Sequence, residues 1–491
     1  MTGEVDRRTF LVAAGSAAVA LPRRVSPRRH PIVTPHPRTL QQAIRGHVFT
    51  PGSPGFSAAA HVYNERFDSI LPQAVARVLD ATDVQAAIGW AVAHGVQVRA
   101  RSGGHSYAGY STLERGVVLD LRLLNQISVD SRAGTATVGA GAQLIDVYAG
   151  LAARGATIPA GSCPSVGVAG VTLGGGMGLA GRAFGLTTDQ LVSAALVTAG
   201  GQLRTIDGRS DPDLLWALKG GGGGNFGVVT QFTFKLHTLP ASAAYVFASF
   251  PWSAAGEALE AWLRWAPHAD SRLSSIFHLN AAPHQASASI AGQFIGPSAA
   301  LGPLLAPLRA VPGASIATGD QGYLGLQLRW AGCLGLSEAA CHTVGASAGG
   351  TLPRENFDAK SDYLSRPLPA AALSVLTRAI EARTGQPGSG AILFDSYGGA
   401  INTVAPSATA FVHRDMLCAI QYLSYNGADA WLADTWSRMR PYVSGQAYQN
   451  YIDASLPNWQ SAYYGANYPR LQELRRATDP HHFFSFPQAI S

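Results

Sequence analysis

The chain is poor in charged residues, which make up 13% of its 491 positions, and it has only four cysteines and four methionines. So little charge beside a hydrophobic fraction of 47% excludes a disordered chain and indicates a globular protein. No apolar run reaches the roughly 20 residues of a membrane span. No His or Cys spacing resembles a zinc site. The length leaves room for two or three domains.

The positive charge of the chain is concentrated at its start. Six arginines fall in the first 29 residues, where Glu4 and Asp6 offset two of them, so this segment carries +4 of the net +6 and leaves +2 for the rest. A nearly neutral body predicts no nucleic-acid partner. The arginines are Arg7, Arg8, Arg23, Arg24, Arg28 and Arg29.

The first residues resemble a twin-arginine export signal. Arg7 and Arg8 precede the apolar stretch Val12 to Leu21, and Ala18-Val19-Ala20 offers a small-residue cleavage site. A basic tail with an accidental apolar run is the alternative. We expect residues 1–37 to be an export signal and leader, read by the twin-arginine machinery, with the protein delivered to an extracellular, periplasmic or cell-wall location.

The cysteines divide into different roles. Cys333 and Cys341 are eight positions apart, and in an exported protein a loop-closing disulfide is favoured over two free thiols. Cys418 lies in a largely apolar run and is expected to be buried. Cys163 stands among small residues in Gly161-Ser-Cys163-Pro-Ser-Val-Gly167.

Hydrophobic periodicity predicts an α+β first domain that ends near His237. Its expected helices are 83–93 and 143–154, and its expected strands are 96–100, 117–121, 135–138, 194–197, 203–206 and 228–236. No Gly-x-Gly-x-x-Gly strand-turn-helix begins the domain, which disfavours a Rossmann fold. From about residue 240, expected strands at 245–250, 287–294, 391–397 and 418–423 alternate with Ala- and Leu-rich helices. This pattern predicts a second domain, a sheet covered by helices.

Two glycine-rich segments each carry one nucleophilic side chain: Arg101-Ser-Gly-Gly-His105-Ser-Tyr107 and the segment around Cys163. Glycines let the backbone approach a ligand closely, and free N–H groups can face an anion. Further glycine runs follow at 174–176 and 220–224, and the second run leads into Asn225-Phe226-Gly227. A hydrogen-bonded loop histidine and a core cysteine are the alternatives for each segment alone.

Together these motifs resemble the berberine-bridge-enzyme-like FAD-linked oxidases, from about Phe67 to Gln488. The resemblance implies a two-part PCMH-type FAD-binding domain at 38–239, a substrate domain with a mostly antiparallel sheet at 240–445, and a segment at 446–491 that returns to the FAD domain. It implies FAD bonded through its 8α-methyl carbon to His105 and through carbon 6 to Cys163. The expected cofactor residues are Arg101, Ser102, Gly103, Gly104, His105, Ser106, Tyr107, Cys163, Val166, Gly167, Gly170, Gly174, Gly175, Gly178, Asn225, Phe226 and Gly227.

The resemblance also supplies the expected catalytic residues. Tyr448-Gln-Asn-Tyr451-Ile-Asp453 matches the family's Tyr-x-Asn-Tyr-x-Asp segment, which implies Tyr451 as the base with Tyr448 nearby. A tyrosine titrates near 10 and needs a stabilised phenolate. Asp395 could accept its hydrogen bond, although a carboxylate would raise its pKa. Gln421 replaces a carboxylate base of some members, and an amide cannot act as a base.

The expected reaction is oxidation of an alcohol or hemiacetal carbon, such as that of an oligosaccharide. Val166 implies a small oxygen pocket, and hence an oxidase that uses molecular oxygen and forms hydrogen peroxide. A tailoring oxidase of a secreted natural product, a poorly oxygen-reactive dehydrogenase and a flavin-binding protein without turnover are the alternatives. Trp262 to Trp265 and Tyr323 to Trp330 could stack on sugar rings or pack in the core.

Overall fold

The structure, a computed structural model, describes residues 37–427 and 429–491, and these belong to one compact unit, Pro37–Ser491. The expected export signal therefore lies outside the described residues, except for Pro37. Within the described ranges, no helix combines the length and the apolar character needed to cross a membrane.

A four-stranded sheet begins the first domain, in the order β1 (His47–Phe49), β2 (Ala74–Arg77), β4 (Val117–Asp120) and β3 (Val98–Arg101). β2, β4 and β3 are parallel, so β2 and β3 need a crossover helix, α3 (Ala81–His94). The Asp80 side chain caps α3 by accepting hydrogen bonds from the amides of Thr82 (2.9 Å) and Asp83 (3.1 Å). The expected helix and both expected strands are confirmed with small shifts of their ends.

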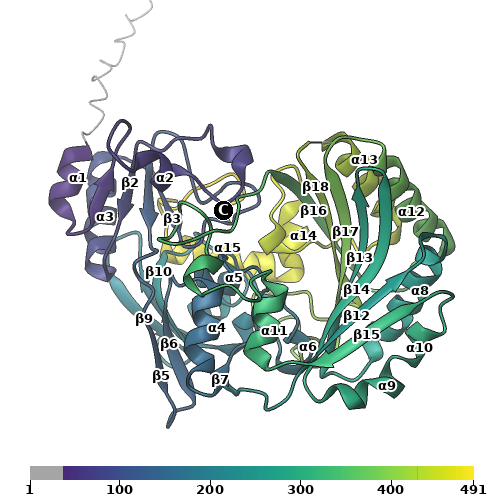
Figure 1. Cartoon of the computed structure of the whole chain (residues 1–491). Helices are drawn as coiled ribbons and strands as arrows, with labels where there is room; N and C mark the ends of the chain where they lie inside the picture. The colour runs from purple at the N-terminus through teal and green to yellow at the C-terminus, as the bar shows by residue number, and fades with distance from the viewer. Residues whose placement is uncertain (1–36, 428) are drawn as a thin grey trace, which may run out of the picture. The chain divides into compact units, whose positions relative to one another are not determined.

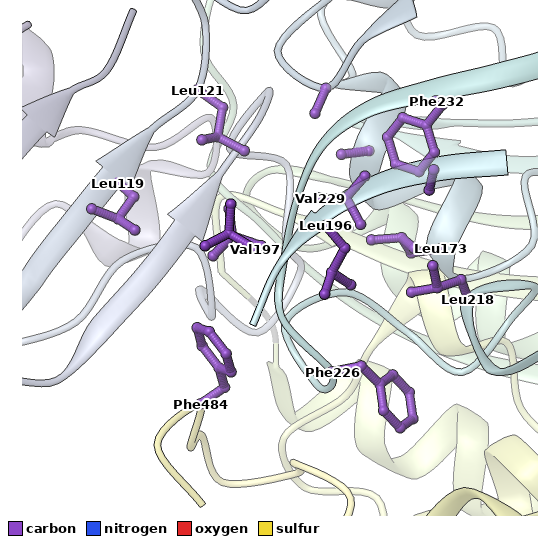
Figure 2. Packing of buried hydrophobic residues seen from close by; sticks show 14 of the residues in the cluster. Leu119, Leu121, Leu173, Leu196, Val197, Leu218, Phe226, Val229, Phe232 and Phe484 are labelled. Carbon is purple, nitrogen blue, oxygen red and sulfur yellow. The ribbon is translucent and has the colours of Figure 1, made fainter. Parts of the chain in front are cut away.

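An antiparallel sheet of five strands follows, in the order β5 (Ile127–Asp130), β6 (Thr135–Gly139), β10 (Val228–Lys235), β8 (Leu191–Val197) and β9 (Leu203–Asp207). Alternate residues of β10 are buried, with Phe232 and Phe234 at 0% exposure. Figure 2 shows Phe232 near Val229, Leu196 and Leu173, the last residue of α5 (Val168–Leu173). The same core receives Leu218 from α7 (Pro212–Leu218).

The second domain is built on seven antiparallel strands. Helices α8 (Ala255–Trp265), α12 (Ala370–Thr384) and α13 (Asp429–Met439) lie along one side of this sheet (Figure 1). Trp262 of α8 is 0% exposed and packs against Phe277 and Phe394, so core packing explains the Trp262 to Trp265 segment. The strand order is β15 (Ser315–Asp320), β12 (Ala244–Phe250), β14 (Gln285–Phe294), β13 (Leu273–Ala282), β17 (Ser389–Ser396), β18 (Cys418–Tyr425) and β16 (Phe357–Leu364).

The C-terminal segment packs against the first domain. After α14 (Trp459–Tyr464) and α15 (Tyr468–Thr478), Phe484 enters the first domain's core (Figure 2). Arg475 of α15 is fully buried, pairs with Asp479 at 2.6 Å and donates to the carbonyl of Asn225. The amide of Ile490 donates to the side chain of Asn225 at 3.0 Å. The first domain is therefore assembled from two separate stretches of the chain.

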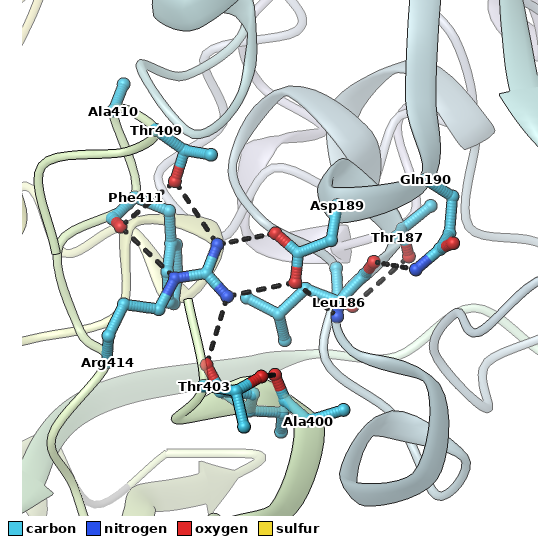
Figure 3. A network of polar contacts seen from close by, with 12 residues as sticks. Leu186, Thr187, Asp189, Gln190, Ala400, Thr403, Thr409, Ala410, Phe411 and Arg414 are labelled. Atoms are coloured by element: carbon cyan, nitrogen blue, oxygen red, sulfur yellow. Dashed lines mark hydrogen bonds and ion pairs between the residues drawn. The ribbon is translucent and has the colours of Figure 1, made fainter. Parts of the chain in front are cut away.

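A buried ion pair joins the two domains. Arg414, from the segment between β17 and β18, donates to both carboxylate oxygens of Asp189, at 2.6 Å and 2.9 Å (Figure 3). Asp189 also accepts the amide of Leu186 at 2.8 Å, and Arg414 reaches the Thr409 hydroxyl at 3.2 Å. Each charge therefore has hydrogen-bond partners in place of water, as a buried pair requires.

Candidate active site

The two glycine-rich segments meet directly. A side-chain carbon at Gly103 would collide with the backbone nitrogen of Gly167, so only glycine allows the loops to lie this close. Gly104 takes the left-handed conformation, with φ +76°, which turns the chain just before His105. As a result His105 and Cys163 both line one cavity of about 450 Å³.

Most of the expected site residues line this cavity. They are Ser102, Gly103, Gly104, His105, Ser106, Tyr107, Cys163, Val166, Gly167, Gly170, Gly178, Gly227, Asp395, Gln421, Tyr448 and Tyr451.

Five expected cofactor residues do not line the cavity. Arg101 is buried, pairs with Asp120 and donates to the carbonyls of residues 59–61. Asn225 bonds to Gly221 and Ile490, while Phe226 lies in the core. Side-chain carbons at Gly174 and Gly175 would meet Asn450 and Phe411, so these glycines make room for the protein itself. These contacts place the five residues outside the cavity lining, and their roles at the cofactor stay predictions.

The imidazole of His105 is held as a neutral base. Its ring stacks on Tyr63 with centroids 3.9 Å apart and an interplanar angle of 18°. Nε2 shares a hydrogen bond with the Ser165 hydroxyl at 2.9 Å, which leaves Nδ1 as the nitrogen that can face the cavity. Burial lowers the pKa of His105 to about 3, so the ring keeps a free lone pair at neutral pH.

Cys163 is exposed to the cavity. The protein around the thiol and the nearby carboxylate of Glu355 together raise the pKa of Cys163 to about 11. The side chain is therefore a neutral thiol at physiological pH and must lose a proton before its sulfur can act as a nucleophile.

Tyr451 contacts the His105 segment through Tyr107. Its ring stacks on Tyr107 at 5.3 Å and meets the Tyr448 ring edge-on at 4.9 Å. Burial and the nearby carboxylate of Asp395 raise the pKa of Tyr451 well above 10. Tyr451 is accordingly a protonated phenol, a hydrogen-bond donor rather than a base in this environment.

The phenol oxygen of Tyr448 accepts three N–H donors. They are the amides of Gly176 (2.9 Å) and Met177 (3.2 Å) and the side chain of Asn450 (2.9 Å). The Asn450 amide is oriented by a second bond to the Val171 carbonyl at 3.0 Å. Burial raises the pKa of Tyr448, and the three donors oppose that rise. The phenolate support expected for Tyr451 is thus found at Tyr448.

Asp395 projects from β17 into the cavity. Among the described residues its carboxylate has no recorded hydrogen bond or ion pair, including none to Tyr451, and burial raises the pKa of Asp395 to about 7. Across the sheet, Gln421 of β18 donates to the Tyr107 hydroxyl at 2.8 Å. A general base works best when its pKa lies near the working pH, so Asp395 is the best-suited proton acceptor among the cavity residues on β17 and β18.

Several cavity residues carry no sequence motif. Tyr63, Glu355, Phe357 and Tyr425 surround the Cys163 side of the cavity. Glu355 is placed by backbone hydrogen bonds with Tyr63 and Glu65, distant in sequence. No local signal predicts such a contact; only the folded chain brings these segments together.

The opposite end of the cavity suits a long polar ligand. The side-chain atoms Arg99 Nε, Tyr110 Oη, Ser111 Oγ and Gln449 Oε1 belong to lining residues and are buried without a partner. A side-chain carbon at Gly170 would meet nothing within 4 Å. Open space beside a glycine and unpaired polar atoms fit a nucleotide cofactor that supplies the missing partners.

The fold and this cavity define an FAD-linked oxidoreductase. The family model for an FAD binding domain matches residues 72–207, and the model for berberine and berberine-like proteins matches residues 447–491. The uncharacterized FAD-linked oxidoreductase YgaK of Bacillus subtilis (strain 168) is 33% identical over 461 residues, which cover 91% of this chain and 97% of YgaK. The chain belongs to the berberine-bridge-enzyme-like family of FAD-linked oxidoreductases, and its α+β fold with a PCMH-type FAD-binding domain is that of the family.

Solved structures agree over nearly the whole chain. BBE-like 1 of Physcomitrella patens is 30% identical with a TM-score of 0.85, covering 92% of this chain and 98% of that one. A chitooligosaccharide oxidase is 25% identical with a TM-score of 0.82 and the same coverage.

The grass pollen allergen Phl p 4, which has glucose dehydrogenase activity, is 28% identical with a TM-score of 0.82, covering 92% of this chain and 98% of the allergen. One variant of it, with a histidine in place of an asparagine, is a glucose dehydrogenase. The variant that also has a valine in place of an isoleucine is a glucose oxidase.

Proposed function

We propose that the protein is an exported oxidase that removes hydride from an alcohol or hemiacetal carbon, with molecular oxygen as final acceptor and hydrogen peroxide as product. The observation that carries this proposal is the placement of His105, Cys163, Asp395 and Tyr451 around one cavity. FAD, when bound, supplies the hydride acceptor. Export rests on the twin-arginine pattern of residues 1–37 alone.

His105 and Cys163 are the proposed sites of covalent attachment. The neutral imidazole, with Nε2 engaged by Ser165, offers Nδ1 for a bond to the 8α-methyl carbon. The Cys163 thiol, after losing its proton, offers sulfur for a bond to carbon 6. Each attachment would replace a C–H bond of the flavin, with loss of that proton, and the two electrons released would pass to molecular oxygen. Two attachments would retain the cofactor in a cavity that must also admit a substrate.

Acid precipitation tests the attachment without any substrate. We expect the flavin to remain with the precipitated wild-type protein and with the single variants His105→Ala and Cys163→Ala. The double variant should release it, and intact-protein mass should show the same pattern. Free flavin in the wild-type supernatant would refute covalent attachment.

Asp395 and Tyr451 are the proposed proton-handling pair. Loss of hydride from an alcohol carbon requires the hydroxyl proton to leave, and Asp395 titrates where it can accept that proton near pH 7. Tyr451, a phenol well below its pKa, would orient the hydroxyl and pass its proton on. Tyr448, fixed by three donors, would hold the Tyr451 ring through their edge contact. This changes the expected base from Tyr451 to Asp395.

Val166 supports oxygen as the electron acceptor. It lines the cavity three residues after Cys163 and packs against the small cluster of Leu144, Tyr148 and Ala160. In the pollen allergen, the exchange of isoleucine for valine is the difference between the dehydrogenase and oxidase variants. A valine here therefore favours an oxidase over a dehydrogenase with poor oxygen reactivity.

A sugar is the favoured substrate class because the chitooligosaccharide oxidase and the pollen glucose dehydrogenase share this fold. The second candidate, a tailoring oxidase of a secreted natural product, is favoured by the aromatic lining of Tyr63, Phe357 and Tyr425. Anaerobic stopped-flow mixing with sugars and with aromatic secondary alcohols separates the two, because only a true substrate bleaches the flavin absorbance. Readmitted air should restore the absorbance with one hydrogen peroxide per turnover; no bleaching by either class would refute the proposal.

A further inference from the structure

The sheet face that carries Asp395 continues beyond the cavity. In the antiparallel register, Asp395 of β17 lies opposite Ile276 of β13, which in turn lies opposite Ala291 of β14. Ala291 lies opposite Phe247 of β12, and Phe247 lies opposite Ala317 of β15. Directly paired residues point to the same side of a sheet. One row of side chains therefore runs from the catalytic wall on β17, across β13, β14 and β12, to the edge strand β15.

A second row runs beside the first, from Leu393 through His278, Ser289 and Ser249. We call the outer part of both rows the distal strip, which consists of His278, Ser289, Ala291, Ser249, Phe247 and Ala317. Phe247, Ser249 and Ala317 are exposed and the others are half-buried. By contrast, the intervening residues Val246 and Ala248 are buried on the helix-covered side.

The residues of the distal strip carry no charge. Its side chains are small except for His278 and Phe247, and burial lowers the pKa of His278 to about 4, so that ring is neutral as well. Such a surface would repel neither hydroxyl groups nor the apolar faces of sugar rings. One positive charge lies beside the strip, because the guanidinium of Arg329 is 6.0 Å from the centroid of the Phe247 ring.

Phe247 is a preorganised aromatic surface at the far end of the strip. Its ring meets Trp330 at 5.6 Å and Tyr245 at 5.6 Å. The guanidinium of Arg329 covers the Tyr245 ring at 4.7 Å and is itself held by Gln321 at 2.7 Å. Trp330 donates to Gln293 at 2.9 Å. Phe247 nevertheless keeps 36% of its surface exposed, which is unusual for a ring packed by so many partners.

We propose that the distal strip binds the outer rings of an uncharged oligosaccharide whose terminal ring reacts at Asp395, with Phe247 as the stacking platform. This rests on the proposed function and adds a chain-length preference to it. Three strand spacings, about 14 Å, separate Phe247 from Asp395. A monosaccharide in the cavity cannot span that distance, whereas an extended oligosaccharide along the strip can.

The test is a length series of neutral cello-oligosaccharides, from glucose upward, with the apparent Kd taken from anaerobic flavin reduction. In the wild type we expect the apparent Kd to fall as the chain lengthens and then level off. Phe247→Ala should raise the apparent Kd of the long oligosaccharides roughly three- to tenfold, because one aromatic contact is lost. The apparent Kd of glucose and the limiting rate of flavin reduction should stay unchanged. Phe247→Tyr should retain the wild-type dependence. Val192→Ala, an exposed apolar change on β8, is the matched control.

Binding without turnover separates this inference from the proposed function. Trp330 lies beside Phe247, so its fluorescence should respond to a long cello-oligosaccharide even if no sugar is oxidised, and the response should be lost in Phe247→Ala. An apparent Kd independent of chain length, or an equal effect of Phe247→Ala on glucose and on long chains, would overturn the inference. The inference would also be overturned if long cello-oligosaccharides caused neither flavin reduction nor a change in fluorescence. A fluorescence change without flavin reduction would show binding and would refute only the proposed oxidation of sugars.

Discussion

At the scale of single residues, the pKa of each group in the site depends on whether its side chain is buried with or without hydrogen-bond partners. Asp395 enters the cavity without a recorded partner among the described residues, and burial alone raises its pKa to about 7. Tyr448 is the opposite case, a phenol oxygen with three donors. The two groups line the same cavity but differ in their hydrogen-bond surroundings, which act on the pKa of each group in different ways.

The first prediction concerns the pH dependence of flavin reduction. A base must be deprotonated to accept a proton. The rate of flavin reduction should therefore be low below pH 7, where Asp395 is protonated, and should increase as the pH rises through the pKa of Asp395 at about 7. Asp395→Asn should lower the rate by about 10²- to 10⁴-fold and abolish this acid limb. Single-turnover reduction between pH 5 and 9 measures both effects. Asp320→Asn, an exposed carboxylate on β15, should change neither; an acid limb that persists in Asp395→Asn would assign the proton to another group.

The second prediction concerns Val166. Val166→Ile adds one methylene group at the cavity wall and should slow reoxidation by air roughly tenfold, about 1.4 kcal/mol in the barrier, while anaerobic reduction stays unchanged. Val171→Ile adds the same volume at another position of the same cavity wall, so the comparison tests whether the effect is specific to position 166. Equal reoxidation rates in the wild type and both variants would remove Val166 from the oxygen path.

Sequence patterns located the two nucleophilic loops but not every wall of the cavity. The His105 and Cys163 segments are contiguous motifs, so their loops could be predicted from local chemistry. Glu355 could not, because its position depends on backbone bonds to residues 63 and 65. Motif chemistry also did not reveal that the Arg101 side chain turns into the core to pair with Asp120.

At the scale of elements, apolar runs predicted the strands β12, β14, β17 and β18 of the second domain. Burial alternates strictly in β12, whereas β18 is buried at seven consecutive positions because both of its faces are covered. β16 was missed because Asp358, Lys360 and Asp362 interrupt it; in the folded chain Lys360 pairs with Asp453 and Asp362 with Arg440. β13 and β15 were missed for a similar reason. Serine, histidine and asparagine interrupt the apolar pattern of β13, and serine, threonine and glycine weaken that of β15.

The third prediction tests the cap of α3. Asp80→Ala removes the acceptor for two helix amides and should lower the free energy of unfolding by about 1 kcal/mol. Its ion pair with Arg45 is largely exposed and should add little. Asp80→Asn keeps an oxygen at the cap and should lose much less. Urea denaturation followed by circular dichroism gives both values, and equal losses in the two variants would show that charge, not capping, is responsible.

The disulfide Cys333–Cys341 belongs to this scale as well, and its formation answers the question that the cysteine spacing left open. Both cysteines are buried against Ile145, near the start of α4 (Leu144–Ala152). The amides of Leu144 and Ile145 in turn donate to the carbonyls of Val166 and Pro164. The closed loop therefore supports the helix end that holds the Cys163 segment.

At the scale of the whole molecule, the domain contact near the site depends on buried charge. Arg414 and Asp189 come from different domains, and Arg414 has no exposed side-chain surface. A buried pair is costly to break because the remaining charge has no water to replace its partner.

The fourth prediction follows from that pair. Arg414→Met should destabilise the protein by about 3–5 kcal/mol, because Asp189 is left buried and unpaired. Arg414→Met combined with Asp189→Asn should recover part of the loss, and the two single variants complete a double-mutant cycle. Midpoints of urea unfolding, followed by tryptophan fluorescence, provide the comparison. Strictly additive losses would mean that the two side chains do not stabilise each other.

The return of the C-terminal segment sets the order of events when the protein is made. Phe484, Ser485 and Phe486 form part of the cavity wall, and Ile490 holds Asn225 at the end of the glycine run. While these residues are still inside the ribosome, the cavity lacks one wall, even though His105 and Cys163 were synthesised long before. We therefore expect flavin to bind only after residues 484–490 have emerged, so a nascent protein stalled before residue 484 should carry no flavin.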